Sequence, residues 1–239
     1  MSLILIQTIV QSVGSTIAWF GFSIGIRALP GSKARQWRWT IGSAVVAAVW
    51  LIGVFLLGAG NVFRNDVLTT RIPIAIGATL FVGYLLLLSP TFRRIVDAVP
   101  QHWLIGIQTF RILGGLFLVR YFAGELPGLF ALPAGIGDVA AGFLAPFVAY
   151  AWYSGKPYAR GAAIVWNLFG MADLVNAVAL AALTGGGGGI IFPTVLVPVY
   201  GVPRAFLIHS CSLIGLLRRT SQQPRRAESL HYGMDAARA

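Results

Sequence analysis

Long apolar runs alternate with short polar connections along the chain as far as residue 218. A helix needs about 20 mostly apolar residues to cross about 30 Å of hydrocarbon, and seven runs have that length. Their predicted limits are 3–26, 39–60, 72–90, 103–124, 132–154, 161–184 and 190–217. The pattern predicts an all-α, polytopic membrane protein, with a bundle of seven transmembrane helices over residues 1–218 and a basic, loose tail over 219–239.

The composition agrees with this class of protein. Of the 239 residues, 57% are hydrophobic and 10% are charged, whereas soluble domains carry about 25% charged residues. The first apolar run lacks the positive amino-terminal region of a signal peptide and exceeds its usual apolar length of about 7–15 residues. We therefore expect this run to remain as the first membrane span.

The basic residues predict the orientation of the bundle. Thirteen Lys and Arg residues lie in the first, third and fifth connections and the tail, against three near the opposite ends of the spans. Basic residues favour the cytoplasmic side, so we expect the amino terminus outside and the carboxyl terminus inside a plasma (inner) membrane. The net charge of +11 then reflects contacts with anionic lipids, and no nucleic-acid partner is expected, because the arginines follow no single polar face.

Four charged residues lie deep within the predicted spans, and a charge at the bilayer centre costs about 2.5–3.5 kcal/mol. Depths counted at about 1.5 Å per residue place the polar residues in two layers. The middle-to-outer layer holds Asp138, Asp173 and Arg204. The inner layer holds Gln108, Arg111, Asn167 and His209. This placement predicts that Asp173, Asp138 or both pair with Arg204.

The seventh run contains Pro198, Gly201 and Pro203, which disfavour a regular α-helix. We expect helix seven to be kinked or broken near Gly201–Pro203, with Pro203 opening an inner half-helix. Arg204 and the amino terminus of that half-helix would together bind a carboxylate or phosphate. In the alternative interpretation, the prolines only kink the helix and an aspartate takes the place of the anion.

Other polar positions carry weaker signals. Gln7, Gln11, Gly14 and Ser15 recur at helical spacing in the first run, which is more typical of helix packing than of a pore lining. A retinal Schiff base is excluded because both lysines, Lys33 and Lys156, lie in connections rather than spans.

No other cofactor or metal is expected. His209 is the one histidine within a run, so haem is unfavoured, and histidines and carboxylates do not follow zinc-ligand spacing. The sequence also lacks the common catalytic motifs, which makes an enzyme the less favoured class.

The leading functional hypothesis is binding and transport of a small, anionic solute through a polar central cavity. Arg204 would bind the solute, Asp173 and Asp138 would be its exchangeable partners, and Arg111 with His209 would form a gate or proton path. One alternative is a non-catalytic membrane subunit or scaffold, a homo-oligomer or partner of another protein, whose buried charges are purely structural. The other is a membrane-embedded enzyme acting on a lipophilic substrate, for which His102 and Asp97 are the candidate acid–base residues near the membrane interface.

Overall fold

A computed structural model describes residues 3–63, 71–184 and 192–218. Seven helical spans in it are long and apolar enough to cross a membrane, which confirms the predicted all-α membrane bundle. The predicted loose tail and the glycine run 185–189 lie outside the described residues. The elements are α1 (Leu3–Ala28), α2 (Lys33–Ala59), α3 (Arg71–Leu88), α4 (Pro90–Ala98), α5 (Gln101–Gly106), η1 (Ile107–Gly115), α6 (Leu116–Phe122), α7 (Gly128–Tyr153), α8 (Ala159–Thr184) and η3 (Val197–Gly201), with helix continuing over 202–218.

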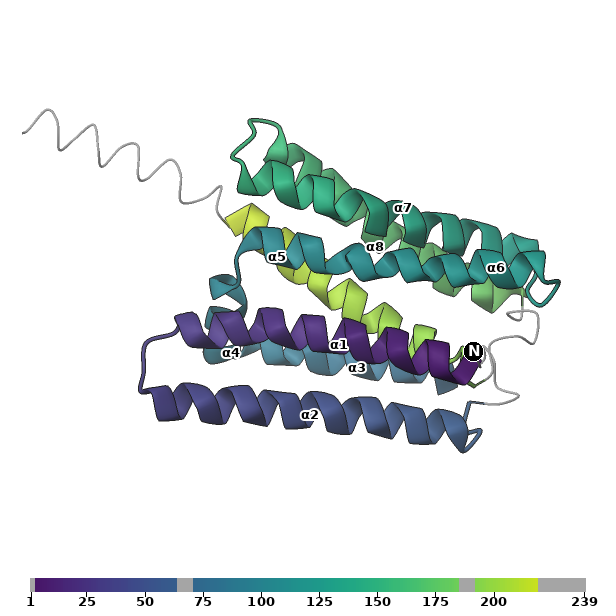
Figure 1. The fold of residues 1–239 in the computed structure, drawn as a ribbon, viewed down its shortest axis with the longest axis horizontal. Helices are drawn as coiled ribbons and strands as arrows, with labels where there is room; N and C mark the ends of the chain where they lie inside the picture. The colour runs from purple at the N-terminus through teal and green to yellow at the C-terminus, as the bar shows by residue number, and fades with distance from the viewer. Residues whose placement is uncertain (1–2, 64–70, 185–191, 219–239) are drawn as a thin grey trace, which may run out of the picture.

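The seventh span, Val197–Arg218, lies at the centre of the bundle. The fourth span, formed by α5, η1 and α6, packs with α7 and α8 on one side of it, and α1 to α4 lie on the other (Figure 1). Half of the seventh span is buried inside the protein, compared with 11% of α2 and of α3. Side chains of the seventh span therefore meet both groups of helices.

Local sequence explains where several elements begin. The Ser32 hydroxyl accepts a hydrogen bond from the backbone N–H of Arg35 and caps α2. Ser89 caps α4 in the same way, and Pro90 follows it at the first helical position. The prediction treated this segment as a connection, but α4 is amphipathic and packs along α1 with Ile95 buried.

Glycine allows the fourth span and α7 to approach closely. A Cβ atom at Gly142 would run into the backbone of Arg111 and Ile112. Small residues permit this contact between membrane helices, where van der Waals packing drives association. The approach brings the Arg111 side chain up to α7 and α8.

Two spans depart from regular α-helix. The fourth span is a 3₁₀-helix over Ile107–Gly115, where the sequence predicted a continuous α-helix. The seventh span is π-helical over Val197–Gly201, so the predicted irregularity lies just before Pro203. The helix is not interrupted there, because the Val202 N–H donates to the Val197 carbonyl. The half-helix with an open amino terminus at Pro203 is therefore wrong.

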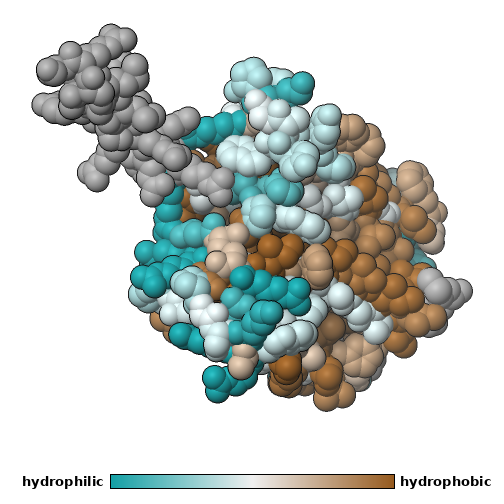
Figure 2. Space-filling view, turned by 60° about the vertical axis from the view of Figure 1, so that its left-hand side comes forward, coloured by the Kyte–Doolittle hydropathy of each residue, from teal (hydrophilic) through white to brown (hydrophobic). Residues whose placement is uncertain are grey.

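The surface of the bundle separates polar and apolar residues. Figure 2 shows hydrophilic residues gathered at the end where α2 begins, and hydrophobic residues covering the flank. Large apolar side chains such as Val46, Val49 and Leu56 are exposed along α2. An apolar flank with a polar end is the surface expected of a helix bundle in a bilayer.

Candidate functional site

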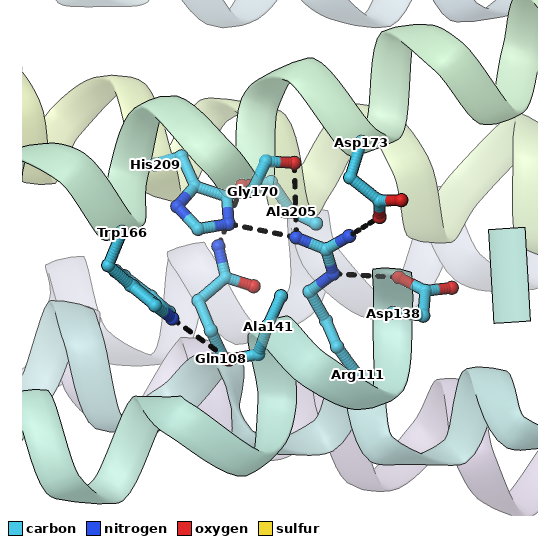
Figure 3. A network of polar contacts seen from close by, with 9 residues as sticks. All are labelled: Gln108, Arg111, Asp138, Ala141, Trp166, Gly170, Asp173, Ala205 and His209. Carbon is cyan, nitrogen blue, oxygen red and sulfur yellow. Dashed lines mark hydrogen bonds and ion pairs between the residues drawn. The ribbon is translucent and has the colours of Figure 1, made fainter. Parts of the chain in front are cut away.

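An arginine with two carboxylate partners lies between the fourth span, α7 and α8 (Figure 3). The Nε atom of Arg111 donates to Asp138 Oδ1 at 2.7 Å, and its Nη2 atom donates to Asp173 Oδ2 at 2.5 Å. The Arg111 side chain is only 1% exposed, so both ion pairs are shielded from solvent. A buried guanidinium requires such charged partners.

The third nitrogen of Arg111 connects these ion pairs to the seventh span. Arg111 Nη1 donates to the Gly170 carbonyl and to His209 Nε2, both at 3.1 Å. An arginine can only donate, so Nε2 accepts and the imidazole carries its proton on Nδ1. That Nδ1–H donates to Asn167 Oδ1 at 2.9 Å. We call Arg111, Asp138, Asp173, His209 and Asn167 the Arg111 network.

The network makes further hydrogen bonds through Asn167, and Gln108 lies next to it. Asn167 Nδ2 donates to the Ala163 carbonyl and to Ser212 Oγ. Gln108 Nε2 donates to the Ala205 carbonyl at 2.8 Å, whereas its buried Oε1 atom has no partner within the described residues. Gln108 therefore joins the fourth and seventh spans next to the network.

The structure corrects the predicted pairing of charges. Asp138 and Asp173 both bind Arg111 and not Arg204, so the two predicted layers of polar residues are wrong. A 3₁₀-helix rises about 2.0 Å per residue rather than about 1.5 Å, which carries Arg111 about 2 Å further along its span than the α-helical count, and its long side chain extends toward the carboxylates. Asp138, Asp173, Asn167 and His209 then lie within reach of one guanidinium.

Among the residues that the structure describes, Arg204 has neutral partners only. Its Nη1 atom donates to Ser15 Oγ at 2.9 Å and to the Gln11 carbonyl at 3.3 Å. The guanidinium also lies over the rings of Phe110 and Tyr200, with its central carbon 4.6 and 5.1 Å from their centroids. The buried Nε atom has no hydrogen-bond partner among the described residues.

Every carboxylate in the described part of the chain binds an arginine other than Arg204. Asp97 pairs with Arg218 and Glu125 with Arg120, and the remaining two belong to the Arg111 network. Within residues 3–63, 71–184 and 192–218, Arg204 thus lies in a membrane span without a carboxylate partner.

A cavity of about 890 Å³ opens beside Arg204. Residues of α1, α2, α3, α4 and the fourth and seventh spans line it, and most of them are apolar. Arg35 and Arg38, near the start of α2, belong to its lining as well. We call it the Arg204 cavity. Its apolar walls and its position between α2 and the centre of the bundle differ from the polar central cavity that the sequence predicted.

A second cavity, of about 50 Å³, lies between Arg204's partners and the Arg111 network. Gln7, Gln11, Arg111 and Asp138 are among its lining residues. The buried Gln7 Oε1 atom has no partner within the described residues, and the volume suffices for one or a few water molecules. Gln11, which binds Arg204, and two members of the Arg111 network therefore line the same small cavity.

The sequence signal for these contacts was the stripe of Gln7, Gln11, Gly14 and Ser15. Gln11 and Ser15 bind Arg204, and Gly14 leaves room for its guanidinium, which would overlap a Cβ atom there. The sequence carries no signal for the cavity itself, because the pattern of one helix does not show how far a neighbouring helix lies from it.

Neither metal chemistry nor the candidate enzyme residues gain support from the geometry. In the described ranges, no three His, Cys, Asp or Glu side chains gather to form a possible metal site. Asp97, considered as an acid–base group, is bound to Arg218 in an exposed ion pair, and the His102 ring packs edge-on against Tyr153.

Comparison with known proteins places this architecture in a family. Residues 69–217 match the model of a domain of unknown function, DUF8737. The chain belongs to the DUF8737 family. The match includes the Arg111 network and Arg204, whereas α1 and α2 of this DUF8737 protein precede it. No curated protein and no solved structure matches the chain.

Proposed function

We propose that this multi-pass membrane protein binds a small anionic solute at Arg204 and carries it across the membrane. The observation that supports the proposal is a guanidinium without a described carboxylate partner at the wall of a large cavity. The plasma membrane, with the amino terminus outside, is the location that the basic residues favour.

The energetics of Arg204 favour an anionic ligand. A charge within a membrane span is costly, and neutral hydrogen bonds and aromatic faces compensate it only in part. A carboxylate or phosphate adds charge-assisted hydrogen bonds, which are about twice as strong as those between neutral groups. Binding of an anion would therefore supply Arg204 with the countercharge that Arg111 already has.

Transport also needs a change of access, and the irregular helices suit that role. The π-helical segment Val197–Gly201 precedes Arg204, and the 3₁₀ segment Ile107–Gly115 lies beside it with Phe110 against the guanidinium. Such segments often mark hinges, because their hydrogen bonds can shift by one residue. We propose that rearrangement of these two segments exposes Arg204 toward one side and then the other.

Thermal unfolding in a neutral detergent tests the binding step. The wild type is heated with a panel of small organic anions beside Arg204→Gln and Arg218→Gln, two variants of the same span. Arg218 lies outside the cavity lining and is partly exposed. We expect one anion class to stabilise the wild type and Arg218→Gln but not Arg204→Gln. Equal stabilisation of all three proteins, or none of the wild type, would contradict the proposal.

The second candidate is a non-catalytic membrane subunit or scaffold. The fully paired Arg111 network favours it, because these groups satisfy one another without a solute. If the whole chain serves this role, Arg204 only stabilises the fold, as the groups of the Arg111 network do. Its replacement would then lower stability with and without anions, while a partner protein would remain bound.

A further inference from the structure

The lining of the Arg204 cavity is mainly hydrocarbon and aromatic rings. Trp19, Trp39, Trp50 and Trp103 belong to it. The indole N–H of Trp19 is already bound to the Thr40 carbonyl and to Ser43 Oγ, each at 3.2 Å. The charged residues of the wall, Arg35, Arg38 and Arg204, are all cationic.

We propose that the ligand is a single-chain amphiphile, whose anionic head group binds Arg204 and whose hydrocarbon chain occupies the rest of the cavity. This inference rests on the proposed binding function of Arg204 and specifies the ligand class. The head group is a carboxylate or a phosphate, because both accept several hydrogen bonds from a guanidinium.

The size and lining of the cavity support this class of ligand. Its volume of about 890 Å³ falls within the range of about 300–1,000 Å³ that encloses one small organic molecule. A compact, hydrophilic anion at Arg204 would leave most of the apolar wall in contact with water or lipid. A hydrocarbon chain covers that wall and gains the free energy of burial.

The position of the cavity gives such a molecule access. α2 forms one wall, lies at the outside of the bundle (Figure 1) and is among the least buried spans. Arg35 and Arg38 line the cavity near the start of α2 and are exposed. These charges would attract an anionic head group at the membrane surface before it moves inward to Arg204.

Two glycines of α2 offer a matched pair of variants. Gly42 lines the cavity, and a Cβ atom there would meet no atom within 4 Å. Gly53 is equally unhindered but does not belong to the lining. Both glycines lie inside the helix, so Gly42→Leu and Gly53→Leu should fold. Only the leucine of Gly42→Leu would occupy the part of the cavity that the ligand's hydrocarbon chain needs.

The experiment measures thermal unfolding in nanodiscs of neutral phosphatidylcholine with butanoate, octanoate, hexadecanoate or the two-chain lipid phosphatidylglycerol. At concentrations about a hundredfold above the dissociation constant, we expect hexadecanoate to raise the midpoint by roughly 5–10 °C. The shift should grow with chain length in the wild type and Gly53→Leu and vanish in Arg204→Gln. In Gly42→Leu, the gain from the longer chain should be lost while any response to butanoate remains.

Other outcomes distinguish failure of the amphiphile proposal from failure of the proposed binding function at Arg204. If butanoate stabilises as strongly as hexadecanoate and the effect requires Arg204, the binding function stands and the amphiphile is overturned. If phosphatidylglycerol stabilises and the alkanoates do not, the single-chain assignment is overturned. If no probe depends on Arg204, both proposals fail, and bilayer lipid merely fills the cavity.

Discussion

Arg204 donates to the hydroxyl of Ser15 at 2.9 Å, and the described carboxylates all bind other arginines. This contact joins the first and seventh spans at the edge of the Arg204 cavity. Ser15 Oγ in turn lies 2.7 Å from the Tyr200 hydroxyl. The first span thus positions a cation without neutralising it, which is the arrangement expected of a site for an anion.

Removal of the Ser15 hydroxyl should weaken ligand binding. A hydrogen bond to a charged group contributes about 1.5–3 kcal/mol, and 1.4 kcal/mol corresponds to about a tenfold change in affinity. We expect Ser15→Ala to lower the affinity for hexadecanoate by about tenfold in a calorimetric titration. Ser12→Ala, on the same helix but outside the cavity lining, should bind as the wild type does. Equal affinities of the two variants would show that Ser15 does not position Arg204.

Neutralisation of Arg111 should destabilise the protein strongly. Arg111→Gln leaves Asp138 and Asp173 buried near each other without a cation, and breaking a buried ion pair costs about 3–5 kcal/mol. Denaturant unfolding in detergent measures the loss. Combining Arg111→Gln with Asp138→Asn and Asp173→Asn should restore most of the stability, because no buried charge is then unpaired. If the triple variant were as unstable as the single one, the network's ion pairs would not explain the loss.

A methyl group at Gly170 should disturb the network from α8. Its Cβ atom would overlap the His209 ring and lie 3.0 Å from Arg111 Nη1. Overpacking of this kind costs about 1–3 kcal/mol. We expect Gly170→Ala to lower the unfolding midpoint and Gly161→Ala, whose Cβ meets no atom within 4 Å, to leave it unchanged or raise it. Indistinguishable midpoints would refute the close packing of α8 on His209.

The predicted orientation can be tested by labelling from outside the cell. In a Cys211→Ser background, Ala123→Cys should react with a membrane-impermeant maleimide in intact cells, because the α6–α7 connection is expected outside. Lys156→Cys, in the α7–α8 connection, should react only after the membrane is opened. Both positions are exposed in the structure. The reverse pattern of labelling would invert the orientation that the basic residues predict.

Apolar patterning predicted the spans well, because hydrocarbon requires long helices with satisfied backbone groups. The run 161–184, for example, corresponds to α8 at Ala159–Thr184. Periodicity could not predict the 3₁₀ geometry around Arg111, where the fourth span packs closely against α7 at Gly142. The identity of the intramembrane polar residues was therefore evident from the sequence, whereas their pairing required the actual rise and rotation of each helix.

The Arg204 cavity was harder to predict from the sequence than the membrane spans were. Its polar end combines Ser15 of α1 with Arg204, residues 189 positions apart. Its apolar wall includes tryptophans whose membrane-facing and cavity-facing roles look alike in a hydropathy pattern. Only the placement of α2 relative to the seventh span distinguishes the two roles.

Quenching of tryptophan fluorescence by a brominated single-chain carboxylate tests the central claim most directly, since Trp19, Trp39, Trp50 and Trp103 line the cavity beside Arg204. The titration compares the wild type with Arg204→Gln and Arg218→Gln in neutral nanodiscs. We predict saturable quenching in the wild type and in Arg218→Gln, with binding at least about tenfold weaker in Arg204→Gln, as expected for the loss of a charge-assisted contact. Equal, non-saturating quenching in all three proteins would contradict an anion site at Arg204.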